Sequence, residues 1–332
     1  MKRILCTLLI AFGAAMQCAY GRGMEGASNA EPDKVVVDTD IGDDIDDALA
    51  LALLLKSPQV QLLAVTTAWG DTRLRGQLVD RFLKETGYGE TPVGIGIEKH
   101  APKEGTFSQR RWAEQQPARP HPDAVTLLLE TIRRYPGEVT LLAIAPLTNV
   151  AAAYDRDPTT FRKLKRIVMM GGSIHLGYGD LGYARPKGPD AEYNIAMDPG
   201  AAQKVFSSGA DLYVMPLDST QLKLDEEKRL LIFTHSSPVT DALTLLYQQW
   251  FEAARATPTV FDAMAAAFVD DPAQCPVEPM RIRVDEQGYT RVEEGEPNAH
   301  VCLRSDSDRF FQFYLPMLLG HGSAQHASMA AH

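Results

Sequence analysis

Six aspartates lie within ten positions, in the stretch VVVDTDIGDDIDDA at residues 35–48. Three consecutive valines precede them and predict a buried strand, so the acidic run begins where that strand ends. Like charges at contact distance repel, and burial strengthens the repulsion. A hard cation would neutralise such a group, and oxygen ligands favour calcium or magnesium over zinc. The stretch therefore predicts a site for a hard divalent cation.

Two other classes of acidic motif fit this stretch less well. The spacing lacks the glutamate of an EF-hand loop, and the flanking elements are a strand and then a helix. A strand that ends in Asp-x-Asp, here Asp38 and Asp40, also begins the haloacid-dehalogenase-type phosphatases. Those enzymes have Thr or Val two residues after the second Asp, where this chain has Gly42. A phosphatase is therefore a less favoured alternative.

Strand-like and helix-like segments alternate along most of the chain. The predicted strands are residues 35–37, 61–67, 93–97, 139–145, 166–170 and 212–216. The predicted helices are residues 46–56, 74–86, 124–135, 149–154 and 199–208, and residues 98–122 are predicted to be a long surface loop. This order predicts a single α/β domain, a Rossmann-like, mostly parallel sheet flanked by helices. Sites in such folds lie at the carboxyl ends of the strands.

The N-terminal segment is typical of an exported protein. Lys2 and Arg3 precede an apolar run at residues 4–16, and a small-x-small pattern comes after it. We therefore expect a signal peptide at residues 1–21 and a secreted or periplasmic protein. Cys18 leaves lipoprotein anchoring as a less favoured alternative, and the apolar run is short for a membrane span.

The rest of the chain is predicted to consist of a flexible tether at residues 22–33, one folded domain at residues 34–320 and a tail at residues 321–332. A formal net charge of −10 over 332 residues argues against partners such as nucleic acid or anionic membranes. Cys275 and Cys302 could pair in an oxidising compartment or remain as thiols, because two cysteines make no disulfide framework.

Four short motifs succeed one another in a specific order. They are the opening DxD…DDA, then APLTN at residues 145–149, then MGG at 170–172 with AEYN at 191–194 and DP at 198–199, and finally FD at 261–262 with DP at 271–272. In this order they resemble the inosine-uridine-type nucleoside hydrolases, over nearly the whole chain after the signal segment. The chain is identified as a divergent, bacterial-type secreted member. The resemblance implies hydrolysis of the N-glycosidic bond of ribonucleosides to ribose and free base.

The resemblance also implies one bound calcium ion. Its protein ligands would be the carboxylates of Asp40, Asp47 and Asp262 and the backbone carbonyl of Ile144, and two ribose hydroxyls and a water would complete the shell. Asp40 would be the catalytic base that takes a proton from the calcium-bound water. The sugar would pass through an oxocarbenium-like state that the surrounding carboxylates stabilise.

Further residues are implied to bind the sugar. Asp46 would hold a sugar hydroxyl, and Glu192 and Asn194 would hold the far end of the ribose near its 5′-hydroxyl. Asp71 stands where the family usually has an asparagine that contacts the ribose. The partner is then a small-molecule nucleoside, and the family suggests a homodimer or homotetramer.

Three other polar residues near these motifs are predicted to be structural. Asn149 would begin a helix and shape its loop, and Asp198 would cap the next helix. Asp38 would accept backbone N–H groups rather than bind a metal.

The chain departs from the family pattern at two places. The opening loop is two residues longer, so Asp43 and Asp44 are extra and either could replace an expected metal ligand. Phe261 occupies the place of a histidine that protonates the leaving base in several members, and a phenyl ring cannot donate a proton. Leaving-group activation would then come from aromatic stacking or from an acid on a mobile loop.

The candidates for contact with the leaving base are Trp69, Phe261, His175 and Tyr183, of which the last two lie in the Gly-rich segment 173–189. Base specificity stays open. A calcium-dependent nucleoside- or sugar-binding protein with weak or no catalysis is the main functional alternative.

Overall fold

The computed structural model describes residues 31–99, 107–179 and 187–320 of the chain. It divides into two units, Met1–Glu31 and Pro32–His332, and all the described helices and strands lie in the second. The predicted signal peptide, most of the predicted tether and the predicted C-terminal tail lie outside the described residues. In the described part, no helix has both the length and the apolar character to span a bilayer.

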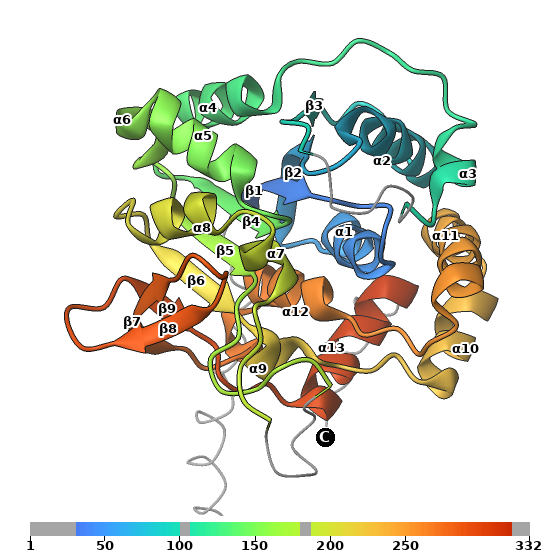
Figure 1. The fold of residues 1–332 in the computed structure, drawn as a ribbon. Helices are drawn as coiled ribbons and strands as arrows, with labels where there is room; N and C mark the ends of the chain where they lie inside the picture. The colour runs from blue at the N-terminus through green and yellow to red at the C-terminus, as the bar shows by residue number, and fades with distance from the viewer. Residues whose placement is uncertain (1–30, 100–106, 180–186, 321–332) are drawn as a thin grey trace, which may run out of the picture. The chain divides into compact units, whose positions relative to one another are not determined.

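The centre of the second unit is a nine-stranded sheet with the order β3-β2-β1-β4-β5-β6-β9-β7-β8 (Figure 1). The strands are β1 (Asp33–Thr39), β2 (Val60–Thr67), β3 (Val93–Ile95), β4 (Val139–Ile144), β5 (Arg166–Met170), β6 (Leu212–Met215), β7 (Glu278–Val284), β8 (Thr290–Glu293) and β9 (Ala299–Val301). Neighbouring strands are parallel from β3 through to β9, whereas β7 is antiparallel to β9 and β8. The predicted mostly parallel sheet is confirmed.

Helices cover both faces of the sheet. They are α1 (Asp46–Lys56), α2 (Thr72–Thr86), α3 (Arg110–Ala113), α4 (Ala124–Arg134), α5 (Thr148–Arg156), α6 (Pro158–Phe161), α7 (Tyr193–Ala196), α8 (Pro199–Phe206), α9 (Leu217–Thr220), α10 (Glu226–Thr234), α11 (Pro238–Ala254), α12 (Phe261–Asp270) and α13 (Ser307–Leu319). A short 3₁₀ helix, η1, spans Pro272–Gln274. Side chains alternate between the faces along each strand, so Val35 and Val37 pack in one core and Val36 in the other.

The first core lies between the sheet and α1, α2, α11, α12 and α13, and the second between the sheet and α4, α5 and α8 (Figure 1). Helix α1 is apolar on nearly all sides, as its sequence predicts, and residues 46–55 are all buried. Its neighbour α12 carries four buried alanines, at 263 and 265–267. Small side chains allow two helices to approach closely, so the first turns of α1 and α12 lie close together.

Two parts of the chain differ from the prediction. Residues 98–122 are not only a surface loop, because α3 lies within them and buries Trp112 and Ala113. The Arg81 guanidinium lies 4.3 Å from the centroid of the Trp112 ring, so a charged side chain packs on this buried aromatic residue. The elements after β6, from α9 to α13, were not predicted. Cys275 and Cys302 form a disulfide there, with Cα atoms 5.9 Å apart.

Candidate active site

A cavity of about 370 Å³ opens at the carboxyl ends of β1, β4 and β5. It brings together ten of the residues singled out in the sequence: Asp40, Asp43, Asp44, Asp46, Asp47, Ile144, Glu192, Asn194, Phe261 and Asp262. Met170, Tyr178 and Tyr193 complete the lining. Tyr178 belongs to the segment 173–189, which the sequence offers as a source of an acid, whereas Met170 and Tyr193 are noted there only as parts of motifs. The fold joins distant parts of the chain here, since Asp46 and Asp262 are 216 positions apart.

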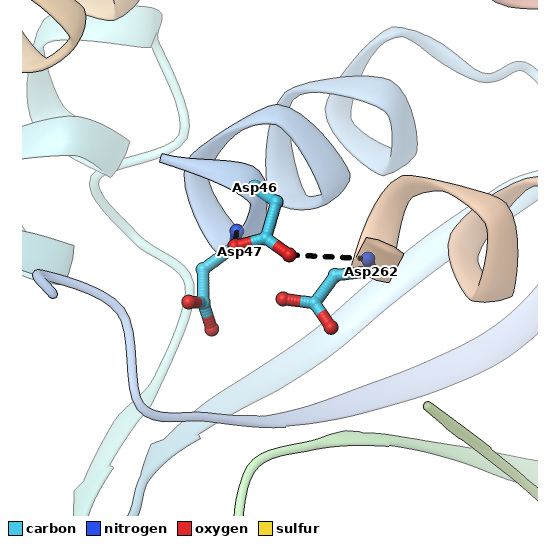
Figure 2. Close-up of side chains that lie close together, drawn as sticks. All are labelled: Asp46, Asp47 and Asp262. Atoms are coloured by element: carbon cyan, nitrogen blue, oxygen red, sulfur yellow. Dashed lines mark hydrogen bonds between the residues drawn. The ribbon is translucent and has the colours of Figure 1, made fainter. Parts of the chain in front are cut away.

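Three carboxylates form one end of the cavity, which we call the acidic floor: Asp46, Asp47 and Asp262. Asp46 and Asp47 begin α1 and Asp262 is the second residue of α12, so the side chains gather between two helix N-termini (Figure 2). One carboxylate oxygen from each lies within 4.8 Å of the others. The backbone N–H groups of Asp47 and Asp262 donate to Asp46 at 3.2 and 3.4 Å.

The electrostatics of the acidic floor favour a bound cation. Burial is the main cause that raises the pKa of each of its three carboxyl groups well above the usual value, and repulsion from neighbouring aspartates adds to it. The Thr39 hydroxyl donates to Asp47 at 2.5 Å and opposes this in part. Helix N-termini carry partial positive charge that offsets only a fraction of three negative charges. The cluster can therefore hold a metal ion.

Asp40 lines the same cavity but is not one of the three floor residues. It is 8% exposed, and burial raises its pKa to about 7, while the positive charge of Arg75 opposes the rise. A carboxyl group with a pKa near neutrality can accept a proton from a substrate or a water molecule. The structure thus places a potential base beside the potential metal ligands.

Arg75 is the main functional-site residue that sequence reasoning missed. It lies in α2 with its side chain 3% exposed, and it forms an ion pair with Asp43 at 2.9 Å. Its guanidinium also donates to the carbonyl oxygens of Asp40, Ile41 and Trp69. One arginine thereby fixes the loop that carries Asp40. Its position one turn before the buried Leu78 and Val79, on the apolar face of α2, is a signal that could have found it.

The two extra loop residues have different surroundings. Asp43 pairs with Arg75, whereas the Asp44 carboxylate accepts the backbone N–H of Ile45 at 2.6 Å. Burial raises the pKa of Asp44, and the neighbouring Asp43 adds to this. Ser108 and Gln109, from the segment before α3, donate to the carbonyls of Asp43 and Asp44 at 2.8 and 2.9 Å. The longer loop is therefore tied to the rest of the fold.

Glu192 is not one of the three floor residues; it lines the cavity beyond the carboxyl end of β5, which we call the other end of the cavity, and caps α7. Its Oε2 accepts the backbone N–H groups of Gly172 and Ile195 at 2.9 and 3.3 Å. Its Oε1 accepts the backbone N–H of Asn194 at 3.0 Å and the Tyr178 hydroxyl at 3.3 Å. The Asn194 amide donates to the Met170 carbonyl at 3.1 Å. Both predicted sugar-binding residues are thus held rigidly at the carboxyl end of β5.

Aromatic rings form the side of the cavity. Tyr178 and Phe261 meet edge to face, with ring centroids 6.2 Å apart at an interplanar angle of 82°, and Tyr193 lines the cavity with them. Burial raises the pKa of the Tyr178 and Tyr193 hydroxyls above the usual value. These hydroxyls therefore stay protonated at neutral pH. Such a wall can stack on a planar ligand.

The structure places three of the sequence candidates, Asp71, Trp69 and His175, outside the cavity lining. Asp71 caps α2 by accepting the Leu74 N–H at 3.0 Å, and it is not among the lining residues. Trp69 is buried with φ of 63°, also outside the lining. His175 is exposed and is held through its backbone N–H. Tyr183 lies outside the described residues.

The three polar residues predicted to be structural do have structural contacts. Asn149 joins three loops by contacting Asp38, the Thr67 carbonyl and the Ile97 N–H. Asp198 caps α8. Asp38 differs from the prediction, because it accepts the side chains of Thr66 at 2.6 Å and Asn149 at 2.8 Å rather than backbone N–H groups. Burial raises its pKa to about 6.

Comparison with known proteins shows which family this chain resembles. The family described as inosine-uridine preferring nucleoside hydrolase matches residues 35–312. Uridine nucleosidase 1 of Arabidopsis thaliana is 32% identical over 257 residues, which cover 71% of this chain and 74% of that protein. The pyrimidine-specific ribonucleoside hydrolase RihA of Citrobacter koseri is 36% identical over 200 residues, 56% of this chain and 60% of that protein.

Solved structures agree with the sequence comparison. The plant nucleoside hydrolase PpNRh1 superposes with a TM-score of 0.75 at 26% identity, and the match covers 87% of this chain and 99% of that one. A purine-preferring ribonucleoside hydrolase from Gardnerella vaginalis shares the fold, with a TM-score of 0.71 at 22% identity over 86% of this chain and 98% of that one. The family match spans most of the chain and includes the floor, Asp40 and Glu192. The chain belongs to the inosine-uridine preferring nucleoside hydrolase family.

Proposed function

We propose that this nucleoside hydrolase cleaves the N-glycosidic bond of ribonucleosides with the help of a calcium ion held at the acidic floor. The observation that carries the proposal is the set of three buried carboxylates between the N-termini of α1 and α12. Asp40, Asp47 and Asp262 would hold the ion with the backbone carbonyl of Ile144, the last residue of β4.

The donor set fits a hard divalent cation. The groups at this end of the cavity are carboxylates and a carbonyl, and calcium binds six to eight such oxygens in flexible geometry. No cysteine or histidine, whose ligand atoms select softer metals, is among the residues that line the described cavity, and the sulfur of Met170 accepts the Asn194 amide. A calcium ion there would bind sugar hydroxyls and polarise the attacking water.

The residues that line the cavity would then have the following roles in the reaction. Asp40 accepts a proton from the water that attacks the anomeric carbon. The carboxylates of the acidic floor stabilise the positive charge that develops on the sugar. One of them, Asp46, also holds a sugar hydroxyl. Glu192 and Asn194 lie at the far end, where they position the rest of the ribose.

The aromatic wall supports a role in base recognition. Tyr178, Tyr193 and Phe261 line the side of the cavity and would stack on the leaving base. Two of the relatives are named for uridine or pyrimidine substrates, so we propose pyrimidine ribonucleosides as the first substrates to test.

We also propose that the protein acts outside the cytoplasm. The N-terminal signal pattern at residues 1–21 supports export, and the disulfide between Cys275 and Cys302 fits an oxidising compartment. Mass spectrometry of the protein from its native host distinguishes three outcomes. An N-terminus at about residue 22 supports secretion, a lipidated Cys18 supports anchoring, and an intact N-terminus contradicts both.

The test of function is release of reducing sugar from uridine and a panel of other ribonucleosides, with calcium and then with chelator. We expect release with calcium only. Asp40→Asn should abolish turnover while ribose binding partly survives, and Asp241→Asn, an exposed aspartate in the first turn of α11, is the matched control. Tight calcium binding without turnover of any nucleoside would instead indicate a binding protein.

A further inference from the structure

The segment at residues 173–179 is held against the cavity by two carboxylates that do not line it. Asp218 accepts three consecutive backbone N–H groups, those of residues 174–176, at 2.8, 2.8 and 3.3 Å. Asp190 accepts the backbone N–H of Tyr178 at 2.8 Å. Charge-assisted hydrogen bonds of this kind are stronger than neutral ones. The backbone that carries Tyr178 is therefore fixed by the fold.

This anchoring directs the Tyr178 side chain into the cavity. Its hydroxyl donates to Glu192 Oε1 at 3.3 Å and accepts the backbone N–H of Tyr193 at 3.0 Å, while its ring packs on Phe261. Burial and the adjacent Glu192 charge raise the pKa of the Tyr178 hydroxyl, so it keeps its proton. The hydroxyl acts as a hydrogen-bond donor rather than as an acid.

With Tyr178 in place, the hydrogen bonds of Glu192 are complete. An ionised carboxylate has about four acceptor positions. Three are taken by the backbone N–H groups of Gly172, Asn194 and Ile195, which the fold cannot easily withdraw. The fourth is taken by the side-chain hydroxyl of Tyr178. A substrate hydroxyl can donate to Glu192 only where it displaces Tyr178.

We propose that Tyr178 determines specificity at the sugar: its hydroxyl takes the place at Glu192 that a 5′-hydroxyl would occupy, so that the enzyme accepts 5′-deoxyribonucleosides about as well as ribonucleosides. The inference rests on the proposed function, which puts the far end of the ribose at Glu192. It names 5′-deoxyribosides as an additional substrate class for the same reaction.

Removal of the Tyr178 hydroxyl should create a preference that the natural enzyme lacks. Tyr178→Phe removes one of the two donors to Glu192 Oε1, which is unfavourable for a buried carboxylate. A ribonucleoside can supply the missing donor through its 5′-hydroxyl, and a 5′-deoxyribonucleoside cannot. A site with an unpaired polar group discriminates strongly against a substrate that fails to pair it. The variant should therefore favour substrates that retain the 5′-hydroxyl.

The experiment compares kcat/KM for uridine and 5′-deoxyuridine in the natural protein and in Tyr178→Phe. We expect a ratio within about threefold for the natural protein and a shift of about tenfold or more toward uridine in the variant. Tyr193→Phe removes a cavity hydroxyl that none of the described contacts joins to Glu192, and it should leave the ratio unchanged. Thermal melting of each variant checks that it is folded.

The outcomes separate the two proposals. A preference of the natural protein for uridine of more than about a hundredfold, or an unchanged ratio in Tyr178→Phe, would overturn the role of Tyr178 alone. No hydrolysis of either nucleoside in the presence of calcium would overturn the proposed function. Calorimetric binding of uridine and of 5′-deoxyuridine to Asp40→Asn gives the same comparison without turnover, and equal affinities are the expected result.

Discussion

The two ends of the cavity use buried carboxylates in opposite ways. At the acidic floor, three buried carboxylates face one another and share few donors, and burial, with repulsion between them as the second cause, raises their pKa values well above the usual value. At the other end, Glu192 stands among four donors, three of them from the backbone. Burial raises the pKa of Glu192 as well, but all four of these donors oppose that rise.

The difference teaches how one kind of side chain can serve two tasks. A carboxylate that the fold has already satisfied is a rigid acceptor, and its charge contributes to stability. A carboxylate that the fold leaves unsatisfied is a binding group for a cation, and its charge costs stability until the cation arrives. Removing the charge should therefore have opposite effects on stability at the two ends.

The largest expected effect is at the floor. Asp262→Asn should lower kcat/KM on the order of 10³-fold, because it removes a proposed metal ligand and negative charge that would stabilise the sugar in the transition state. It should also raise the melting temperature of the calcium-free protein, since one of three repelling charges is gone. Enzyme assays and calorimetry with chelator present check both effects. A lower calcium-free melting temperature would contradict the description of the floor as a repelling cluster.

Arg75 gives the second largest effect, on stability. Arg75→Met should destabilise the protein by about 3–4 kcal/mol, because it leaves Asp43 and three carbonyl groups near the site without their donor. Arg75→Lys should recover part of the loss, and denaturant unfolding measures each value.

A variant of Asp43, the ion-pair partner of Arg75, sharpens this test. Asp43→Asn in the Arg75→Met background should cost less than in the natural protein, because Asp43 has already lost its ion-pair partner there. Additive losses in this double-mutant cycle would show that the ion pair makes no contribution.

The third effect is the pH dependence of stabilisation by calcium. The pKa values of the floor carboxyl groups are raised, and that of Asp40 is raised to about 7. The folded protein without calcium therefore retains protons that the unfolded chain has lost. The stability that these retained protons contribute is present at low pH and is lost as the pH rises through these pKa values. Calcium needs the deprotonated groups, so its stabilising effect should grow by about 2 kcal/mol between about pH 5 and about pH 8.

Differential scanning calorimetry with and without calcium at both pH values measures this effect, and groups far from the site cancel in the difference. Asp262→Asn should remove most of the pH dependence. Calcium stabilisation of equal size at both pH values would show that the floor does not release protons on binding.

Glu192→Gln should act with the opposite sign to Asp262→Asn. The amide loses charge and presents an NH₂ group to backbone donors, so the free energy of unfolding should fall by about 2 kcal/mol without any metal present. Denaturant unfolding with chelator measures it. A stability equal to or above that of the natural protein would remove the contrast between the two ends.

The smallest effect is expected at Asp71. Asp71→Ala removes the N-cap of α2 and should cost about 1 kcal/mol of stability, whereas Asp71→Asn should retain most of the cap. We expect little change in kcat/KM, since Asp71 does not line the cavity. A fall in kcat/KM of more than about tenfold in Asp71→Ala at unchanged stability would instead place Asp71 at the sugar.

Much of the fold could be predicted from local patterns. The alternation of strands and helices predicted the parallel sheet, and the boundaries of α1 and β5 were predicted at both ends. The pattern failed in residues 98–122, where a polar context concealed the buried Trp112. It also gave no elements after β6, where β8 and β9 are short and α10 exposes Leu230 and Leu231. Periodicity is weak in such elements.

The candidate site shows the same division. The sequence by itself determined the acidic stretch, because its residue types and spacing are read locally. It pointed to Glu192, Asn194 and Asp262 only through the resemblance to a family pattern. Only the tertiary structure decided that Arg75 balances the opening loop and that Tyr178 completes Glu192. These roles depend on contacts between residues that are distant in the chain: Arg75 and Asp43 are separated by 32 positions, and Tyr178 and Glu192 by 14. Burial sets the energies of these contacts. Neither the contacts nor the burial is encoded by residue type alone.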